Sequence, residues 1–323
     1  MKFPRRHFLG LVAGAAALPI VPRAAWALDY PTRPVRVIVG FPAGIGPDIT
    51  GRLMSQWLSD HLKQQFIVDN RPGASSNIAT ELVAKAAPDG YALLVTVSTN
   101  AINATFYKNL AFDFTKDLVP VGFMGATPFV MVVTPSLPAK TLQEFIAYAK
   151  ANPGKINMAS QGVGTSPHVA GEMLMMLTGI KLVHVPYRGN LVPDLLSGQV
   201  QVFFGPQPQV IQYVRDGRLR ALAVTSAKRA EALPDVPALA EFAPGYEALG
   251  WYGISAPAGT PAEIIAKLNK EMNAGLADPA IKAKLLAIGV VPNPMTPAEF
   301  GRYTAEEIDK WAKVVKFANI KAE

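Results

Sequence analysis

The stretch FPAGIGPDITG at residues 41–51 combines glycine and proline in a spacing that could bind an anion through the backbone. It follows the apolar run VRVIVG and precedes a segment of helical character. Gly44 and Gly46 allow positive φ and let a ligand approach the main chain closely. Pro47 suits the first position of a helix, where neighbouring N–H groups lack intrahelical acceptors and can point at an anion. We therefore expect this turn to offer backbone donors to a carboxylate or a phosphate.

The stretch QGVGTSPHVAG at residues 161–171 repeats this pattern after the strand-like run INMAS. Gly162 and Gly164 supply the conformational freedom. The pair Thr165–Ser166 could cap a helix that begins with Pro167. The two stretches together predict two anion-binding turns, and two purely structural turns are the alternative.

Signatures of nucleotide binding are missing from the first turn. It lacks the GxxxxGK[ST] pattern, and Asp48 would be a poor neighbour for a triphosphate. The dinucleotide pattern GxGxxG fails because Ile49 stands at its third glycine position.

Hydrolytic chemistry has weak support in the sequence. His184 lies in the apolar run LVHVPY and is expected to pack in the core, whereas His168 falls in the first turn of a helix near Ser166. There is no GxSxG elbow and no HExxH or other metal-ligand spacing. The chain has no cysteine, which excludes a disulfide, a thiolate nucleophile and a cysteine zinc site. We therefore expect that the protein is not an enzyme and that it binds no metal and no cofactor. A secreted hydrolase of small esters or amides is the alternative.

The first 27 residues resemble an export signal. The paired Arg5 and Arg6 precede the apolar run FLGLVAGAAALPIVP, which is followed by Arg23 and the small-residue site Ala25-Trp26-Ala27. This order predicts a twin-arginine signal cleaved after Ala27, and hence a periplasmic protein. General secretion and an uncleaved membrane anchor are the alternatives. Four of the 31 basic residues lie in this segment, so the remainder has 27 basic and 24 acidic residues, a net charge of +3. This near-neutral balance argues against nucleic-acid binding.

Strand-like runs alternate with amphipathic segments along the rest of the chain, which predicts an α/β protein with largely parallel sheets. Capping boxes that start helices are expected where Thr141, Thr260 and Thr296 each precede Glu by three residues, and Asp278-Pro279 is expected to open another helix in the same way.

Two extended, glycine-punctuated passages suggest crossings between two domains. These are LVPVGFMGATPFVMVVTP and YEALGWYGISAPAGTP. They predict one lobe of residues 28–125 plus 248–323 and a second of residues 126–247. A single domain is the alternative, because such runs also occur as central strands.

Motifs along nearly the whole chain resemble those of one receptor family. YPTRPVRVIVGFPAG, DNRPGASSNIATELVAKAAPDGYALL, INMASQGVGTSPHVAGE, VHVPYRG, LRALAVTSAKRAEALPDVPALAE and APAGTP are similar to motifs of the Bug-type periplasmic solute receptors of tripartite tricarboxylate transporters. The resemblance implies a type II periplasmic-binding-protein fold, with two α/β lobes, a ligand cleft between them and two crossing strands. It also implies an organic-acid ligand held by loops of both lobes, partly through ordered water.

The resemblance carries over to the loops of this chain position by position. The expected ligand-binding residues are Phe41, Ala43, Gly44, Ile45, Gly46, Asp48, Ser75, Ser76, Thr99, Asn100, Ser160, Gly162, Gly164, Thr165, Ser166, His168, Arg188, Gly205 and Gln207. Ile45 interrupts a run that is usually glycine, and the two hydroxyls of Ser75 and Ser76 could instead cap the next helix. The chain is about two residues shorter than the family pattern after residues 187–189.

One departure from the family bears on the ligand. Gly205 and Gln207 follow a strand after which many members have Asp, and the missing carboxylate disfavours a cationic amine. We therefore expect a non-amino carboxylate, either a dicarboxylate that reaches both turns or an aromatic acid. Arg188 could hold a distal carboxylate or lie exposed at a loop edge, and Trp251 could line the cleft or pack the hinge.

The predicted function is that of an exported, monomeric receptor. It closes its lobes around a small organic carboxylate and delivers it to a membrane permease of the tripartite tricarboxylate type. A ligand-loaded sensor for a histidine kinase is a further alternative.

Overall fold

The computed structural model describes residues 29–107, 109–187, 189–231 and 233–320. The predicted export signal, residues 1–27, lies outside the described residues. The elements belong to a compact unit of residues 31–323. In the part of the chain that is described, no helix has the length and apolar character needed to cross a membrane.

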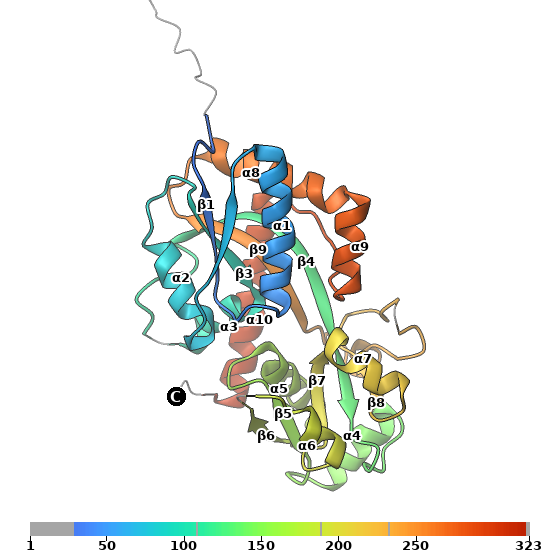
Figure 1. Cartoon of the computed structure of the whole chain (residues 1–323). Coiled ribbons are helices and arrows are strands. Elements are labelled where there is room, and N and C mark those ends of the chain that lie inside the picture. The colour runs from blue at the N-terminus through green and yellow to red at the C-terminus, as the bar shows by residue number, and fades with distance from the viewer. Residues whose placement is uncertain (1–28, 108, 188, 232, 321–323) are drawn as a thin grey trace, which may run out of the picture. The chain divides into compact units, whose positions relative to one another are not determined.

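The apolar runs singled out in the sequence form a mixed sheet with the order β2-β1-β3-β9-β4-β7-β5-β6, and β8 also pairs with β4 (Figure 1). The strands are β1 (Val35–Val39), β2 (Phe66–Asn70), β3 (Ala92–Val97), β4 (Leu118–Val133), β5 (Asn157–Ser160), β6 (Val183–Pro186), β7 (Val202–Pro206), β8 (Arg220–Val224) and β9 (Leu249–Pro257). Pairing is parallel among β2, β1 and β3 and among β6, β5 and β7. It is antiparallel around β4 and β9, so the expectation of largely parallel sheets holds only for the outer strands.

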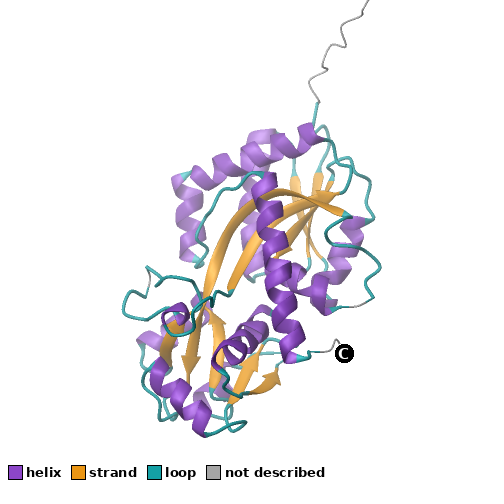
Figure 2. Ribbon diagram, turned by 180° about the vertical axis from the view of Figure 1, so that it is seen from behind, coloured by secondary structure: helices purple, strands orange, loops and turns teal. Residues whose placement is uncertain are grey.

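Helices follow most strands and cover the sheet (Figure 2). They are α1 (Gly46–Leu62), α2 (Asn77–Ala84), α3 (Ser98–Phe106), α4 (Leu142–Ala151), α5 (Ser166–Thr178), α6 (Val192–Ser197), α7 (Gln207–Arg215), α8 (Ala262–Ala277), α9 (Pro279–Ala287) and α10 (Pro297–Ala318), with short 3₁₀ turns η1 (Ala74–Ser76) and η2 (Leu239–Glu241).

Side-chain caps start three helices as predicted. Thr141 accepts from the Glu144 N–H at the start of α4, and Asp278 accepts from two N–H groups of α9. Thr296 and Glu299 form a reciprocal capping box on α10. The capping box predicted at Thr260 is wrong, because its hydroxyl donates to the Pro257 carbonyl instead.

Strand β4 belongs to both halves of the sheet. Its residues 118–128 pair with β9, and residues 129–133 pair with β7 on one side and β8 on the other. The two glycine-punctuated passages are therefore long strands that link two α/β halves, as the predicted fold requires. The lobe boundaries at residues 125 and 248 remain a prediction.

Trp251 packs in the core of these crossing strands. Its side chain is fully buried against Phe123, Phe300 and Tyr303. Its indole N–H donates to Glu307 Oε2 at 3.0 Å, and this buried carboxylate also accepts from the Trp311 indole. Of the two roles considered for Trp251, the structure supports packing at the hinge.

Candidate ligand-binding site

The first glycine turn leads from β1 into α1 without a side-chain cap. Gly44 has φ +84°, as predicted. Gly46 does not take positive φ but is the first residue of α1, and a Cβ there would collide with the Tyr252 hydroxyl. Ile45 is the N-cap residue, and its apolar side chain cannot accept from the first N–H groups of the helix, which lack intrahelical acceptors. The turn thus leaves backbone donors for another partner.

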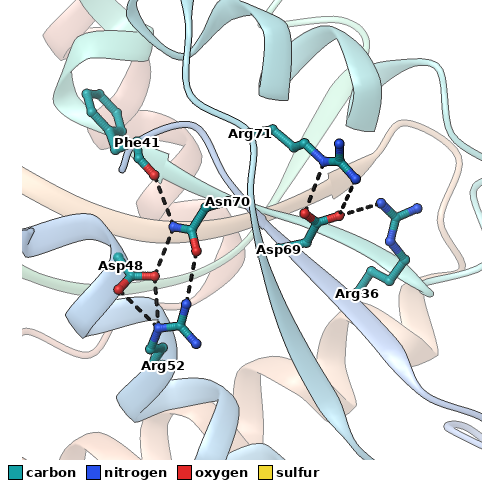
Figure 3. A network of polar contacts seen from close by, with 7 residues as sticks. All are labelled: Arg36, Phe41, Asp48, Arg52, Asp69, Asn70 and Arg71. Atoms are coloured by element: carbon teal, nitrogen blue, oxygen red, sulfur yellow. Dashed lines mark hydrogen bonds and ion pairs between the residues drawn. The ribbon is translucent and has the colours of Figure 1, made fainter. Parts of the chain in front are cut away.

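Asp48 organises this turn from inside (Figure 3). Its carboxylate is buried and accepts the Gly44 N–H at 2.8 Å and Arg52 Nε at 2.9 Å. Asn70 Nδ2 donates to Asp48 Oδ1 at 2.9 Å and to the Phe41 carbonyl at 3.0 Å. Burial raises the pKa of Asp48, but the hydrogen bonds from Arg52, Gly44 and Asn70 outweigh burial and hold the pKa below its usual value. Asp48 therefore shapes the turn as an ionised internal acceptor.

The short turn η1 packs against the end of β1. Its three residues, Ala74, Ser75 and Ser76, have φ of 45°, 52° and 76°, in the left-handed region that strains residues other than glycine. Ser76 is fully buried against Gly40, and its Oγ has no hydrogen-bond partner among the described residues. It is the N-cap residue of α2 but its side chain makes no cap hydrogen bond, so the alternative capping role is wrong for Ser76.

The start of α3 is a buried polar cluster. Asn100 Oδ1 accepts the Val97 N–H at 2.8 Å, and its Nδ2 donates to Thr80 Oγ1 at 2.9 Å. Thr99 is also buried. Both polar atoms of the Asn100 side chain are therefore used in hydrogen bonds that hold α3 against β3 and α2.

The second glycine turn is closed by its own hydrogen bonds. Gly162 and Gly164 have φ of 126° and 75°, as predicted. The Gly162 N–H donates to Ser160 Oγ at 3.1 Å, and Thr165 Oγ1 donates to the Gly162 carbonyl at 2.7 Å. Thr165 is the N-cap residue of α5, as the prediction allowed, but neither its side chain nor that of Ser166 makes a cap hydrogen bond to the helix.

Two stacked histidines lie beneath this turn. The rings of His168 and His184 are 3.6 Å apart with an interplanar angle of 13°. His184 Nε2 is 2.6 Å from Ser160 Oγ, and His168 Nε2 is 3.3 Å from Glu172 Oε1. Burial, and then the neighbouring His168, lower the pKa of His184 to about 3. His184 is therefore neutral near pH 7. It is half-buried on the edge strand β6 and does not belong to the hydrophobic core, so the predicted core packing is wrong.

The two halves of the sheet meet where α3 and α5 begin. Ser98 Oγ lies 2.9 Å from Ser166 Oγ, and both residues are buried. Ser166 thus pairs with a hydroxyl, and the described residues show no hydrogen bond from it to His168. A Cβ on Gly164 would meet the Phe106 ring at 2.9 Å, so α3 also packs on the second turn itself.

Two further predicted residues lie at the end of β7 and the start of α7. Gly205 is inside β7, where a Cβ would collide with Phe203 and Val210, so close packing explains its identity. Gln207 begins α7, and Gln161 Nε2 of the second turn donates to Gln209 Oε1 of that helix at 3.1 Å.

Some residues of the site were missed by sequence reasoning or cannot be placed. Arg188 lies outside the described residues. Ser98, Asn70 and Gln209 were missed, and only Ser98 carried a signal, as the neighbour of the predicted Thr99. Among the described residues no group of three or more His, Asp or Glu side chains could hold a metal ion.

Comparison with known proteins identifies the family. Residues 50–320 match the family described as the tripartite tricarboxylate transporter family receptor. The chain is 37% identical over 292 residues to the protein BugT of Bordetella pertussis, covering 89% of this chain and 90% of that protein.

Two solved structures from Rhodopseudomonas palustris are also similar. Rpa4515 with adipate has 35% identity and a TM-score of 0.81, with 91% of this chain and 99% of that one covered. MatC with bound malate has 29% identity and a TM-score of 0.77, with 88% and 100% covered. The chain belongs to the tripartite tricarboxylate transporter family of receptors.

Proposed function

We propose that this protein is an extracytoplasmic receptor that captures an organic carboxylate by closure of its two lobes and delivers it to a permease of the tripartite tricarboxylate type. One observation carries the proposal: the hydroxyls of Ser98 and Ser166 meet across the two halves of the sheet. This contact brings the N-termini of α3 and α5 together.

The register of the sheet explains why helix N-termini gather there. In the first half β1 and β3 are parallel neighbours, so α1 and α3 begin at the same sheet edge. In the second half β5 and β7 are parallel neighbours, and the contact between Gln161 and Gln209 joins the starts of α5 and α7. Such termini favour negative charge, and each hydrogen bond to a charged group contributes about 1.5–3 kcal/mol.

We infer lobe closure because a ligand could contact loops of both halves only in the closed state of the protein. A ligand that touches loops of both halves gains its full set of contacts only when α3 and α5 are together. Because a ligand shifts a conformational equilibrium by its differential affinity for the two states, it would stabilise the closed form. No covalent step is required.

Two observations support the proposed ligand class: the ligands named for similar proteins and the residues at the end of strand β7. Similar proteins are named as holding adipate and malate, both carboxylates without an amine. Gly205 and Gln207 leave the end of β7 without a carboxylate for a cationic amine. We therefore propose a non-amino carboxylate, with a dicarboxylate and an aromatic acid as the two candidate types. We further propose a periplasmic monomer exported through the predicted signal, with the lobe boundaries given above.

A thermal-shift screen of the purified protein tests this function. Adipate, malate and benzoate should raise the unfolding temperature, whereas aspartate and lysine should not. A ligand at about 100 times its Kd adds about 2.7 kcal/mol to the apparent stability, which is a readily measured shift. Ser166→Ala should weaken the response, and Ser197→Ala on α6, outside the site, serves as the control. Stabilisation by amino acids alone would refute the proposed ligand class.

A further inference from the structure

The side chain of Tyr252 on the crossing strand β9 reaches the first glycine turn. Its neighbour Trp251 packs on Phe300 of α10, and a Cβ on Gly253 would collide with the same ring. Because successive side chains of a strand point to opposite faces of the sheet, Tyr252 points away from α10. On that opposite face its hydroxyl meets the start of α1, where a Cβ on Gly46 would lie 2.4 Å from the Tyr252 oxygen.

The register of the sheet places this hydroxyl in the candidate ligand-binding site. Tyr252 pairs with Val97, the last residue of β3, and α3 begins at the next residue, Ser98. Strands β1 and β3 are parallel neighbours, so α1 and α3 begin at the same edge of the sheet. The Tyr252 hydroxyl therefore lies where the helices of the first half begin, although the residue belongs to a strand that links the halves.

The Tyr252 hydroxyl is a donor without an acceptor in the protein. It has no hydrogen-bond partner among the described residues. Unlike Ser76 Oγ, which is fully buried, it belongs to a side chain that is partly exposed to solvent. The surrounding protein still raises the pKa of Tyr252 to about 12, so the hydroxyl keeps its proton near pH 7. It is therefore free to donate a hydrogen bond to a ligand.

Backbone donors lie at the same helix end. The N–H groups of Ile45, Gly46 and Asp48 have no partner among the described residues, and Pro47 has no N–H. The start of a helix favours negative charge, and a carboxylate has two oxygens that accept about four hydrogen bonds. A hydroxyl donor beside these N–H groups therefore suits a carboxylate.

We propose that Tyr252 is a ligand-binding residue whose hydroxyl donates a hydrogen bond to the carboxylate held at the start of α1. Strand β9 pairs along its length with β4, which belongs to both halves of the sheet, so the ligand also contacts the strands that link the halves. This inference rests on the proposed receptor function and names the side chain that recognises the carboxylate at the first turn.

The variant Tyr252→Phe tests the proposal because it removes only the hydroxyl. Titration calorimetry with adipate, malate and benzoate should give a Kd at least about tenfold higher for every compound that the wild type binds, since a hydrogen bond to a charged group is lost. Stability to urea without ligand should not fall, because the hydroxyl has no partner in the protein. An unchanged Kd would overturn the proposal.

The control variant is Tyr213→Phe, near the end of α7. It also removes a hydroxyl that has no hydrogen-bond partner among the described residues. We expect it to leave each Kd at the wild-type value. An equal loss of affinity in Tyr213→Phe and Tyr252→Phe would contradict a specific role of Tyr252.

A second substitution tests whether the hydroxyl acts at the start of α1. A Cβ on Gly46 would lie 2.4 Å from the Tyr252 oxygen but 3.2 Å from Cζ. Gly46→Ala should therefore displace the hydroxyl and weaken binding in the wild type, and should weaken it much less when Tyr252→Phe is already present. Equal losses in the two backgrounds would show that the hydroxyl does not act at this position.

A direct signal separates this inference from the proposed function. In protein labelled with ¹³C at tyrosine Cζ, the resonance that disappears in Tyr252→Phe belongs to Tyr252. It should shift when a carboxylate saturates the wild-type protein. A carboxylate that binds without moving this resonance would refute the role of Tyr252 and leave the receptor function standing. Binding of none of the three carboxylates would count against the receptor function and against the inference that rests on it.

Discussion

At the scale of single residues, the first turn depends on Asp48. Every partner of its carboxylate is a donor, so Asp48→Asn would place an amide N–H₂ against Gly44, Arg52 or Asn70. We expect the variant to lose about 1–3 kcal/mol of unfolding free energy, the cost of leaving a buried polar group unsatisfied. It should also bind carboxylates more weakly, because the turn would lose its shape. Urea unfolding and calorimetry measure the two effects.

Asp69 provides the matched control, one residue from Asn70 on β2. Its carboxylate pairs with Arg36 and Arg71, whose side chains are about half exposed. Asp69→Asn should cost less than about 1 kcal/mol, as for other exposed ion pairs, and should leave binding unchanged. Equal effects of Asp48→Asn and Asp69→Asn would show that Asp48 has no special role.

The lowered pKa of His184 predicts how the free energy of unfolding depends on pH. Burial and the neighbouring His168 lower its pKa to about 3, from 6.5 in the unfolded chain. Below pH 6.5 the unfolded state therefore binds a proton that the folded state does not, so stability falls progressively as the pH falls toward about 3. Urea unfolding between about pH 7 and pH 5, where carboxylates remain ionised, measures this slope.

The variant His184→Gln isolates this contribution, because Gln does not titrate and can still bond Ser160. Its stability should change less with pH over this range than that of the wild type. His61→Gln, at the exposed end of α1, should leave the wild-type slope largely in place. A wild-type slope in His184→Gln would mean that another group is responsible.

At the scale of elements, local sequence predicted most of the structure. Runs of β-branched residues became strands because such side chains suit a pleated, buried surface. The glycines of the second turn could be predicted because φ near 75° and 126° strains any other residue. The capping box expected at Thr260 does not form, which shows the limit of prediction from local patterns. Its hydroxyl has a nearby carbonyl, that of Pro257, to which it donates.

The capping box on α10 gives a prediction at this scale. Thr296 and Glu299 each bond the backbone of the other. Thr296→Ala should lower the unfolding free energy by about 1 kcal/mol, whereas Thr296→Ser keeps the hydroxyl and should cost little. A double-mutant cycle with Glu299→Ala should show coupling between the two positions. Additive effects would mean that the box acts as two independent contacts.

At the scale of the whole molecule, the missed contacts share one property. Asn70 bonds Asp48 across 22 positions, Ser98 meets Ser166 across 68, and Trp251 bonds Glu307 across 56. No local pattern encodes such pairs, because the order of strands in the sheet decides which turns meet. The resemblance to the family supplied the candidate loops, and the topology was needed to show which side chains meet between them.

Closure of the two halves is the prediction that belongs to the whole molecule. The Oγ atoms of Ser98 and Ser166 are 2.9 Å apart, and the chain has no cysteine, so the double variant Ser98→Cys/Ser166→Cys would contain a single pair of thiols. Oxidation of the two thiols would join the starts of α3 and α5 by a disulfide. Once oxidised, it should hold α3 on α5 and keep the cleft shut.

The disulfide should slow the binding and release of the ligand, and its reduction should restore both rates. Adipate added after oxidation should bind far more slowly than to the reduced protein, and adipate bound before oxidation should be released far more slowly, with normal rates restored by dithiothreitol. The single variants Ser98→Cys and Ser166→Cys control for the loss of each hydroxyl. If the oxidised and reduced forms exchange adipate at the same rate, the two halves do not need to separate for a ligand to enter. The ligand would then have to reach its site by a route that leaves the contact between α3 and α5 intact.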